Sequence, residues 1–474
     1  MALARLLQLL ALTHAVAHAA LLAGSTGATQ ISPRAAAHRA PPPVCAATKK
    51  KKGKSSAAPP KRGFGGGAAP AAAPAAPPNP LDESWRGFEG WLESESVASA
   101  VALADCGGGL RGVQTTKATK AGAELLRVPR ALILDDARAD ASPVGKLWAD
   151  AAAPVPAYLR IALLLLHEAR LGDASPLAQY VAMLPTAAEF AAEGGPAALW
   201  TDDELALLEC PKLAGDAQSR RRLLEEHPVV APPSALAAKW SELGLPGASP
   251  TADELAWAVA AVTSRAYGAD EGGRSISMLI PMVDMANHAH PPNTAKGLDD
   301  DGDAFVVVAA EKLAKGDEVH LSYGPLPNLV LLLQFGFVLP GSDTDFALVD
   351  CGPLLEKCGA AADGAAALAA QADRGLLMRE KDGAVSAWQP GGAQLRAAVE
   401  ALAAAGRLGD EDGRAAYLDL VKRTLLAFGT SADDDKRELK EGGKAMAPRT
   451  RLALTFRREQ KLLLRREFEA AAAA

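Results

Sequence analysis

Residues 276–288 read ISMLIPMVDMANH and residues 318–324 read EVHLSYG, and these two segments decide the fold. The first is an apolar run that ends in an Asp, an Asn and a His. The second alternates like a short strand and reaches Tyr323, which lies 36 residues after Asn287. An Asn amide at the end of an apolar run can bind a ligand, because it both donates and accepts hydrogen bonds. The first segment therefore predicts a buried strand that ends in candidate binding residues.

Length and charge limit the classes of protein that fit. The chain has 474 residues, more than one ordinary domain, with enough Leu, Val and Ile after residue 80 to bury a sizeable core. Residues 1–81 carry ten Lys or Arg and no acid, whereas the remainder carries 40 basic and 56 acidic side chains. Such an acidic body does not indicate a nucleic-acid partner, because that binding depends on neutralising phosphates. Five scattered cysteines, with no CxxC pair, indicate reduced thiols rather than disulfides or zinc.

The first 80 residues have the composition of a targeting leader. Residues 1–19 have a basic start, an apolar stretch of about eleven residues and a small-x-small end, which predict a signal peptide. That stretch is too short to cross a membrane, so we expect no membrane span in the mature chain. Residues 20–80 are basic, acid-free and rich in Ala and Pro, as in a transit-like, disordered linker. A signal peptide followed by a transit-like segment predicts delivery to a plastid. An ordinary N-terminal helix is the alternative to the signal peptide, and a nuclear localisation signal is the alternative for the Lys run at residues 49–52.

The order of elements after residue 80 is strands, helices, strands and helices, which indicates an α+β fold rather than βαβ repeats. Residues 85–92 predict an amphipathic first helix, and residues 124–134 predict a strand, a proline break and a second strand. A helical insert is expected at about residues 140–262. Within it, the segments beginning at Thr201 and Thr251 fit capping boxes.

The two segments quoted first resemble the signature segments of SET-domain protein methyltransferases. Residues 184–185, 200–205 and 264–267 look like further landmarks of the plastid Rubisco large-subunit methyltransferase family. Two tail segments, residues 437–442 and 451–454, narrow the resemblance from SET proteins in general to this family. The resemblance covers roughly residues 82–474. It implies a SET domain of small curved β-sheets at residues 81–340, split by the helical insert, and an all-helical substrate-binding domain at residues 341–474. It also implies that the two signature segments cross in space and form the site for S-adenosyl-L-methionine (AdoMet).

Tyr323 is the candidate catalytic residue. Methyl transfer from a sulfonium to an amine is an in-line displacement, which needs a neutral, aligned amine in a channel that excludes water. Burial favours the neutral form of a lysine, whose ordinary pKa is near 10.4. The resemblance implies that the hydroxyl of Tyr323 orients this amine. The alternative is a Tyr at a strand end that packs its ring and turns its hydroxyl to water.

The resemblance further implies a set of cofactor-binding residues: Gly109, Leu110, Arg111, Gly112, Arg265, Asn287 and His288. The first four would form a loop that offers backbone groups, because glycine permits a close approach. The loop departs from the family, which usually has an acid where Gly109 stands. A plain glycine turn is the alternative for the loop, and a turn Asn with a capping His is the alternative for residues 287 and 288.

Four residues are expected on the substrate side of the channel: Arg265, Asp284, Tyr323 and Phe335. The guanidinium of Arg265 could bind a carboxylate with two parallel hydrogen bonds. The alternative is that Arg265, at the end of a helix, only interacts with the helix macrodipole. The resemblance places Asp284 beside the acceptor lysine, and a structural ion pair is the alternative. Phe335 stands where the family often has Tyr, which leaves open the number of methyl groups added.

Two further groups of side chains have competing interpretations. Asp284, His288 and His290 could hold a metal ion, but no second acidic or His cluster completes such a site, so we expect no metal. The basic residues between Arg457 and Arg466 are expected on a solvated helix face, or on a surface that docks the protein substrate.

These inferences together predict an AdoMet-dependent protein-lysine methyltransferase of the chloroplast stroma, expected to be a monomer. The family implies the Rubisco large subunit or fructose-bisphosphate aldolase as its protein substrate. One alternative is a SET protein that methylates a histidine or a protein outside the plastid. Two others are a catalytically weak SET-fold binding module and a metalloprotein.

Overall fold

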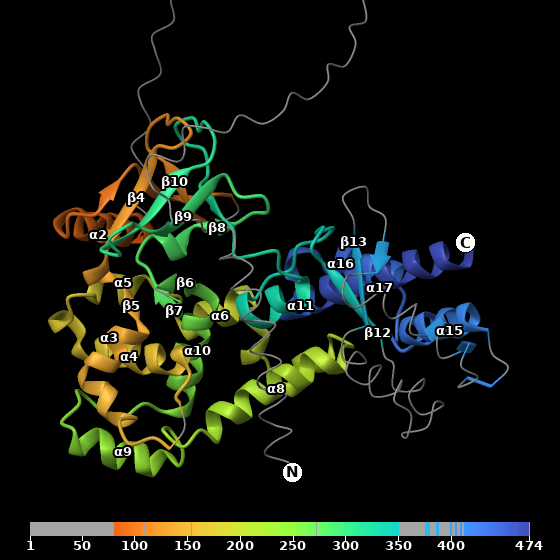
Figure 1. Ribbon diagram of the computed structural model, residues 1–474, viewed down its shortest axis with the longest axis horizontal. Helices are drawn as coiled ribbons and strands as arrows, with labels where there is room; N and C mark the ends of the chain where they lie inside the picture. Colours follow the sequence, from red (N-terminus) through yellow and green to blue (C-terminus); the bar gives the residue numbers. More distant parts are fainter. Residues whose placement is uncertain are drawn as a thin grey trace, which may run out of the picture.

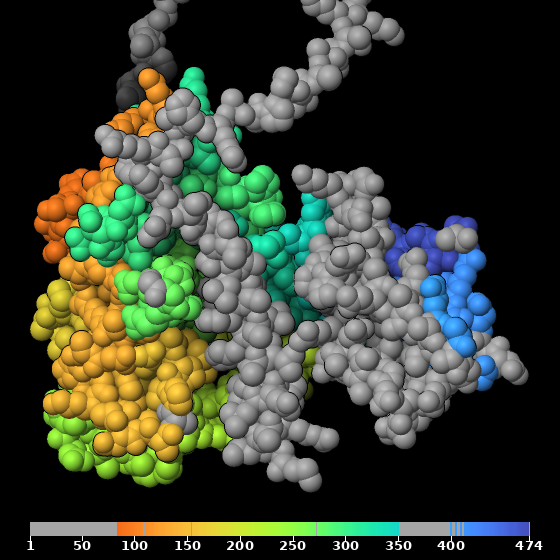
Figure 2. Space-filling model, in the orientation of Figure 1, coloured from red at the N-terminus to blue at the C-terminus, as the bar shows by residue number. Residues whose placement is uncertain are grey.

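The computed structural model describes residues 80–107, 110–152, 154–271, 273–349 and 412–473, with short pieces between residues 375 and 409. The predicted signal peptide, almost all of the predicted linker, and Gly109 lie outside the described residues. Figure 1 shows two lobes, one that contains the small sheets and the helices packed on them and one that contains the last three helices. In Figure 2 the orange to green residues of the first lobe lie on the left and the blue residues of the last helices on the right. No described helix is both long and apolar enough to cross a membrane.

The first lobe contains small sheets, as the α+β prediction requires. An antiparallel sheet of four strands has the order β1 (Ala98–Ser99), β4 (Glu124–Pro129), β10 (Ala304–Ala309) and β9 (Thr294–Leu298). A second sheet pairs β2 (Val101–Asp105) with β3 (Arg111–Thr115), and a third has the order β5 (Leu134–Asp135), β7 (Arg274–Leu279) and β6 (Tyr267–Glu271). Residues 124–134 form a strand, a short 3-10 turn and a second strand, so the predicted break at Pro129 is confirmed.

Helices cover these sheets. The first helix of the described residues is α2 (Pro80–Ser94), which confirms the helix predicted at residues 85–92. The segment between β5 and β6 then holds eight helices: α3 (Asp136–Ala141), α4 (Ala157–Leu171), α5 (Ala178–Met183), α6 (Ala187–Glu193), α7 (Asp202–Ala206), α8 (Pro211–Glu225), α9 (Pro233–Glu242) and α10 (Ala252–Arg265). Both predicted capping boxes are formed, at the starts of α7 and α10. A third, at Thr186 and Glu189 before α6, was not predicted.

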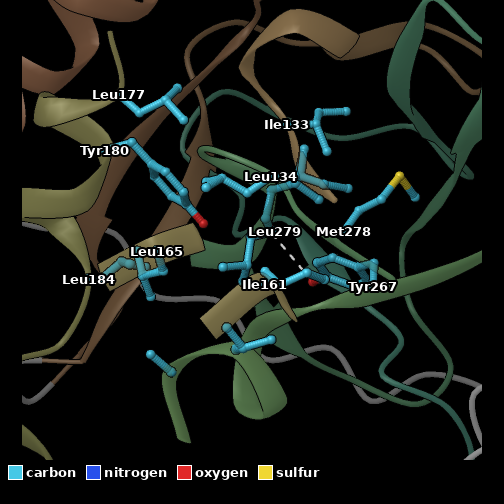
Figure 3. Packing of buried hydrophobic residues seen from close by; sticks show 14 of the residues in the cluster. Ile133, Leu134, Ile161, Leu165, Leu177, Tyr180, Leu184, Tyr267, Met278 and Leu279 are labelled. Atoms are coloured by element: carbon cyan, nitrogen blue, oxygen red, sulfur yellow. Dashed lines mark hydrogen bonds between the residues drawn. The ribbon is translucent and has the colours of Figure 1, made fainter. Parts of the chain in front are cut away.

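The core of the first lobe lies between α4 and the third sheet. Figure 3 shows Ile161 and Leu165 of α4 close to Leu134 of β5 and Leu279 of β7, and all four side chains are fully buried. Each buried Leu or Ile of this kind contributes roughly 1.5–3 kcal/mol of transfer free energy. Tyr180 of α5 enters the same core and turns its hydroxyl inward. This core holds the third sheet, and the chain that leaves β7 leads directly to the candidate site.

The second lobe contains α15 (Gly413–Leu426), α16 (Ala432–Gly442) and α17 (Pro448–Ala473). It also contains an antiparallel sheet, β12 (Phe346–Val349), β13 (Gly375–Arg379) and β14 (Val385–Ala387). The C-terminal region is therefore largely helical, but the prediction of an all-helical domain is wrong at these three strands. Ala347 and Val349 of β12 pack with Leu463 and Leu464 of α17. Such a short apolar run cannot be told from helix by its periodicity alone.

A buried cluster of charges fastens α17 to the rest of the protein. Lys461 Nζ lies 2.7 Å from Asp435 Oδ2 of α16, and Arg457 Nη2 lies 2.9 Å from Asp435 Oδ1. Arg457 Nη1 also pairs, at 2.8 Å, with Glu209 Oε1, which follows α7. Arg457 and Lys461 are only 7% and 1% exposed. The expectation of a solvated or substrate-docking face is therefore wrong for these two residues, because carboxylates from distant segments draw them inward.

Candidate active site

The two signature segments lie side by side. Strand β8 (Asn287–His288) pairs in parallel with β11 (His320–Leu321), so Asn287 stands beside His320 and His288 beside Leu321. The predicted strand at residues 319–323 is thus shorter than expected. The backbone N–H of Ala289 extends the pairing, since it donates to the Leu321 carbonyl at 3.1 Å. This pairing brings the Asn-His dipeptide next to Tyr323, although 36 residues separate Asn287 from Tyr323 in sequence.

A sharp turn carries the first segment from the core into the site. Strand β7 ends at Leu279, and Met282 then adopts a left-handed backbone with φ 69°. This conformation costs a residue with a side chain about 1–2 kcal/mol. The following 3-10 turn, η6 (Val283–Met285), contains Asp284, whose carboxylate is fully buried. The cost of the turn is offset by the apolar side chains around it, since Met282, Val283 and Met285 are all buried.

Tyr323 is held by both its backbone and its hydroxyl. Its backbone N–H donates to His288 Nδ1 at 3.0 Å, and its hydroxyl donates to the Ala286 carbonyl at 2.9 Å. The ring stacks on Phe335 with centroids 4.9 Å apart. Burial raises the pKa of Tyr323 to about 12, so its hydroxyl stays neutral and acts through hydrogen bonds rather than as a phenolate base. The alternative of a hydroxyl turned to water is wrong, because the hydroxyl is bonded within the protein.

His288 is a neutral partner of Tyr323. Burial lowers the pKa of its imidazole to about 4. Because Nδ1 accepts the backbone N–H of Tyr323, the ring proton belongs on Nε2. The His288 ring lies 5.0 Å from the Tyr323 ring, measured between centroids. His288 therefore fixes the position of Tyr323 and carries no charge near neutral pH.

A pocket lies beside Tyr323. All four residues predicted on the substrate side line it, namely Arg265, Asp284, Tyr323 and Phe335, together with Tyr267 and Lys296. Phe335 comes from the π-helical turn η7 (Leu331–Phe335), which follows α11 (Asn328–Val330). Gln334 fastens this turn to α10, since its amide donates to the Thr263 carbonyl at 2.7 Å. Gly336 ends the turn at φ 80°, where an added Cβ would meet the Gly195 carbonyl oxygen at 2.7 Å.

Arg265 and Asp284 form the polar wall of this pocket. Arg265 Nη1 donates to the Asp284 carbonyl at 2.9 Å and lies 3.6 Å from Asp284 Oδ2. The Tyr180 hydroxyl donates to the same Oδ2 at 3.0 Å. Burial raises the pKa of Asp284, and the Arg265 charge opposes that rise. Asp284 Oδ1 and Arg265 Nε are buried without a hydrogen-bond partner among the described residues. An unsatisfied buried polar atom costs about 1–3 kcal/mol, so a bound ligand could stabilise this wall.

Part of the predicted cofactor loop contacts Asn287 of β8. The Asn287 amide donates to the Arg111 carbonyl at 3.2 Å and to Glu318 Oε1 at 2.8 Å. An added Cβ at Gly112 would come within 2.7 Å of Asn287 Nδ2 and would also meet the Cys106 thiol and Glu318. Glycine is therefore required here because protein side chains approach its backbone closely, and the predicted approach of a cofactor to this loop stays a prediction. Burial raises the pKa of the Cys106 thiol to about 11.

The remaining loop residues lie apart from this contact. The Arg111 guanidinium turns away and donates to the Met183 carbonyl at 2.9 Å, and burial lowers its pKa. The Leu110 side chain is 56% exposed. Of the predicted loop, the backbone of Arg111 and Gly112 thus lies against Asn287, whereas Leu110 faces solvent and Gly109 is outside the described residues.

Two residues of the site were not assigned a role from the sequence. Glu318 belongs to the second signature segment, and an acid at the head of an apolar strand was the available signal. Its place beside Asn287 depends on the bridge between Gln114 and Glu318, which joins segments 204 residues apart. Lys296 of β9 belongs to no motif. Its Nζ donates to the Ser322 carbonyl at 2.8 Å and lies 3.6 Å from the centre of the Tyr267 ring.

The described residues contain no group of three or more His, Cys, Asp or Glu side chains placed to hold a metal ion. Of the three residues considered for a metal, Asp284 bonds Tyr180 and Arg265, and His288 Nδ1 bonds the backbone of Tyr323.

Comparison with curated proteins gives short sequence matches. No family model matches the chain. SET domain-containing protein 4 of Artemia parthenogenetica is 28% identical over 80 residues, 17% of this chain and 20% of that protein. The ribosomal lysine N-methyltransferase set10 of Schizosaccharomyces pombe is 28% identical over 99 residues, 20% of this chain and 18% of that protein. The chain thus matches about a fifth of the length of these curated relatives.

Solved structures extend the similarity over most of the chain. The SET domain of LSMT bound to lysine and AdoHcy superposes with a TM-score of 0.60 at 19% identity, covering 83% of this chain and 92% of that one. Rubisco LSMT bound to AdoMet gives 0.58 at 19% identity, covering 82% and 92%. Rubisco LSMT bound to sinefungin and monomethyllysine gives 0.59 at 19% identity, with the same coverage. The chain therefore has the SET fold, which confirms the predicted fold class.

Proposed function

We propose that the chain is an AdoMet-dependent protein-lysine methyltransferase. The observation that carries the proposal is the pocket in which the predicted residues Arg265, Asp284, Tyr323 and Phe335 converge from four separate segments. The SET fold supports it, because the similar structures are complexes with AdoMet, with AdoHcy, with lysine and with monomethyllysine. Asp284 Oδ1 and Arg265 Nε, the two unsatisfied buried polar atoms in the pocket wall, are available to a bound ligand.

The residues around Asn287 fit AdoMet. AdoMet has an ammonium and a carboxylate, and it supplies a methyl group on a positively charged sulfur. The Glu318 carboxylate suits the ammonium, and the Arg265 guanidinium, whose Nε lacks a partner, suits the carboxylate. The missing Cβ of Gly112 leaves the backbone of Arg111 and Gly112 close to Asn287. Glu318 also supplies an acid beside the loop, where the family's usual acid is replaced by Gly109.

The pocket residues suit the positioning of a neutral amine. The neutral hydroxyl oxygen of Tyr323 and the carbonyl oxygen of Ala286, held 2.9 Å apart, can both accept hydrogen bonds from the N–H groups of the amine, which leaves its lone pair free to attack the methyl group. The rings of Tyr267, Tyr323 and Phe335 exclude water, which favours the uncharged form of a lysine. The buried Asp284 carboxylate attracts the ammonium form as it enters. In this proposal the chain acts by orientation and desolvation and needs no covalent intermediate.

The protein substrate we propose is a plastid protein, either the Rubisco large subunit or fructose-bisphosphate aldolase. The leader composition supports a stromal location, and two of the similar structures are of Rubisco LSMT. A ribosomal protein is the second candidate, because one curated relative is a ribosomal lysine methyltransferase. A fluorescent fusion of residues 1–80 tests the location, and a cytosolic or secreted fusion would contradict it.

The test is transfer of radiolabelled methyl from AdoMet into plastid and ribosomal extracts, with mass spectrometry of the labelled bands. We expect label on lysine, and a loss of at least about a hundredfold in Tyr323→Phe, because the variant cannot orient the amine. Tyr158→Phe, a change in α4 outside the pocket, is the matched control and should keep the activity. Label on histidine alone, or equal label from both variants, would contradict the proposal.

A further inference from the structure

One lysine of the chain itself reaches into the pocket. Lys296 lies in β9, which is paired along its length with β10 and fastened to β11 where the Thr294 hydroxyl donates to the His320 carbonyl at 2.7 Å. From this fixed strand the Lys296 side chain lines the same pocket as Arg265, Asp284 and Tyr323. The site therefore already contains a primary amine, Lys296 Nζ, which comes from strand β9 of the chain itself and not from a second protein.

The surroundings of this amine are unusual for a buried lysine. Its Nζ is in contact with the Tyr267 ring, 3.6 Å from the centroid, and donates one hydrogen bond to the Ser322 carbonyl at 2.8 Å. Ser322 immediately precedes Tyr323. No carboxylate of the described residues lies within ion-pair distance of Lys296, so only the face of the Tyr267 ring and the Ser322 carbonyl stabilise the cationic form there. Burial lowers the pKa of Lys296 to about 7, so a large fraction of this amine is neutral under ordinary conditions.

We propose that Lys296 is a methyl acceptor of this active site, so that the chain methylates itself in the absence of another substrate. The inference rests on the proposed methyltransferase function. The lone pair of the neutral Nζ would form a bond to the methyl carbon as the carbon–sulfur bond breaks, and the bonding electrons would return to sulfur. The products are a methylammonium at Lys296 and AdoHcy, and the ammonium then releases one proton to solvent.

The aromatic and carbonyl groups around Lys296 suit the product as well as the reactant. A methylammonium is attracted to the face of an aromatic ring, and the Tyr267 ring already lies against Nζ. The remaining N–H can keep the hydrogen bond to the Ser322 carbonyl. If Lys296 only occupied the pocket, it would inhibit methyl transfer and its own mass would stay unchanged. If Lys296 accepts a methyl group, its mass increases, so mass spectrometry distinguishes the two roles.

The experiment uses the full chain, labelled AdoMet and no other protein. We expect peptide mass spectrometry to find the label on Lys296, at a rate per molecule that does not change over a tenfold range of protein concentration. Lys296→Met should lose at least about nine-tenths of the label. Lys315→Met, which changes an exposed lysine outside the pocket, is the matched control and should keep it.

Two further measurements distinguish the possible failures. Calorimetry measures AdoMet binding separately from transfer. Binding without label at Lys296, or label that rises with protein concentration, would overturn this inference and leave the proposed function intact, whereas absent binding would overturn both. Acetylation of Lys296 by a small reagent, without AdoMet, should reach half its maximal rate near pH 7, well below the value of about 10.4 for an ordinary lysine. A midpoint near 10.4 for Lys296 would also overturn the inference.

Discussion

Each lobe contains a lysine that is enclosed by other residues. Comparing the two lysines distinguishes one that stabilises the fold from one that is suited to methyl transfer. In the second lobe Lys461 is 1% exposed, and its Nζ lies 2.7 Å from Asp435 Oδ2 and 2.8 Å from the Thr430 hydroxyl. In the first lobe Lys296 has an aromatic ring and a backbone carbonyl instead of a carboxylate. A partner of opposite charge fixes a lysine as a cation, whereas desolvation without one releases the neutral amine that methyl transfer needs.

Breaking the charge cluster of the second lobe should give the largest effect. Asp435→Asn keeps the shape of the side chain but leaves Arg457 and Lys461 buried with Glu209 as their shared carboxylate partner and the largely exposed Glu438, 3.7 Å from Arg457, as a second. Removing one partner of a buried charge cluster costs about 3–5 kcal/mol. We expect that loss in the free energy of unfolding, measured with urea. Asp433→Asn, on the exposed side of α16, is the control and should show no measurable change. A loss in Asp435→Asn no greater than in the control would mean that the cluster does not fasten α17.

Replacing Lys296 in the first lobe should raise the free energy of unfolding, whereas Asp435→Asn in the second lobe should lower it. Because burial lowers the pKa of Lys296 to about 7, the unfolded chain binds more protons than the folded one between about pH 7 and 10.5. Wild-type stability therefore rises with pH in this window, and Lys296→Met removes a cost that is largest below pH 7. The side chain is half-buried and partly solvated, so we expect a gain of about 2 kcal/mol at pH 7 that disappears near pH 10. Urea unfolding at both pH values checks this, and a destabilised variant at pH 7 would contradict it.

The Thr430 hydroxyl bridges Lys461 and Asp435, so removing it is a smaller test of the same charge cluster. Thr430 Oγ1 accepts from Lys461 Nζ and donates to Asp435 Oδ1, both at 2.8 Å. Thr430→Ala should cost about 1 kcal/mol in the free energy of unfolding. Thr430→Ser retains the hydroxyl and should stay close to wild type. If both variants lose the same amount, the hydroxyl makes no contribution of its own.

The sequence correctly predicted those parts of the fold that depend on residues close together in the chain. The capping boxes at Thr201 and Thr251 need only residues three apart, and both are formed. The resemblance predicted that the two signature segments would cross, and they do so where β8 pairs with β11. The single buried strand expected from the first segment is instead divided into β7 and β8 by the turn at Met282 and η6. The sheet of β12, β13 and β14 was missed, since β12 is four residues of short apolar sequence that suit helix or strand equally.

The parts that could not be predicted depend on distant partners. Arg457 was expected at a surface, but its partner Glu209 lies 248 residues earlier. Lys296 carries no sequence signal, because its place in the pocket follows from how β9 pairs with β10 and how Ser322 passes beside it. Glu318 stands in a quoted motif, yet its contact with Asn287 appears only when β3, β8 and β11 come together.

Binding of AdoMet is the most direct test of the central claim, which is that the crossing of the signature segments holds this cofactor. Calorimetric titration should show saturable binding of one AdoMet per full-length chain. Gly112→Ala should weaken it by at least about tenfold, roughly 1.4 kcal/mol, because the added Cβ would crowd Asn287 and Glu318. Gly90→Ala in α2, where a Cβ meets no atom within 4 Å, should bind like wild type. Absence of binding by the wild-type chain, or equal binding by Gly112→Ala, would contradict the account.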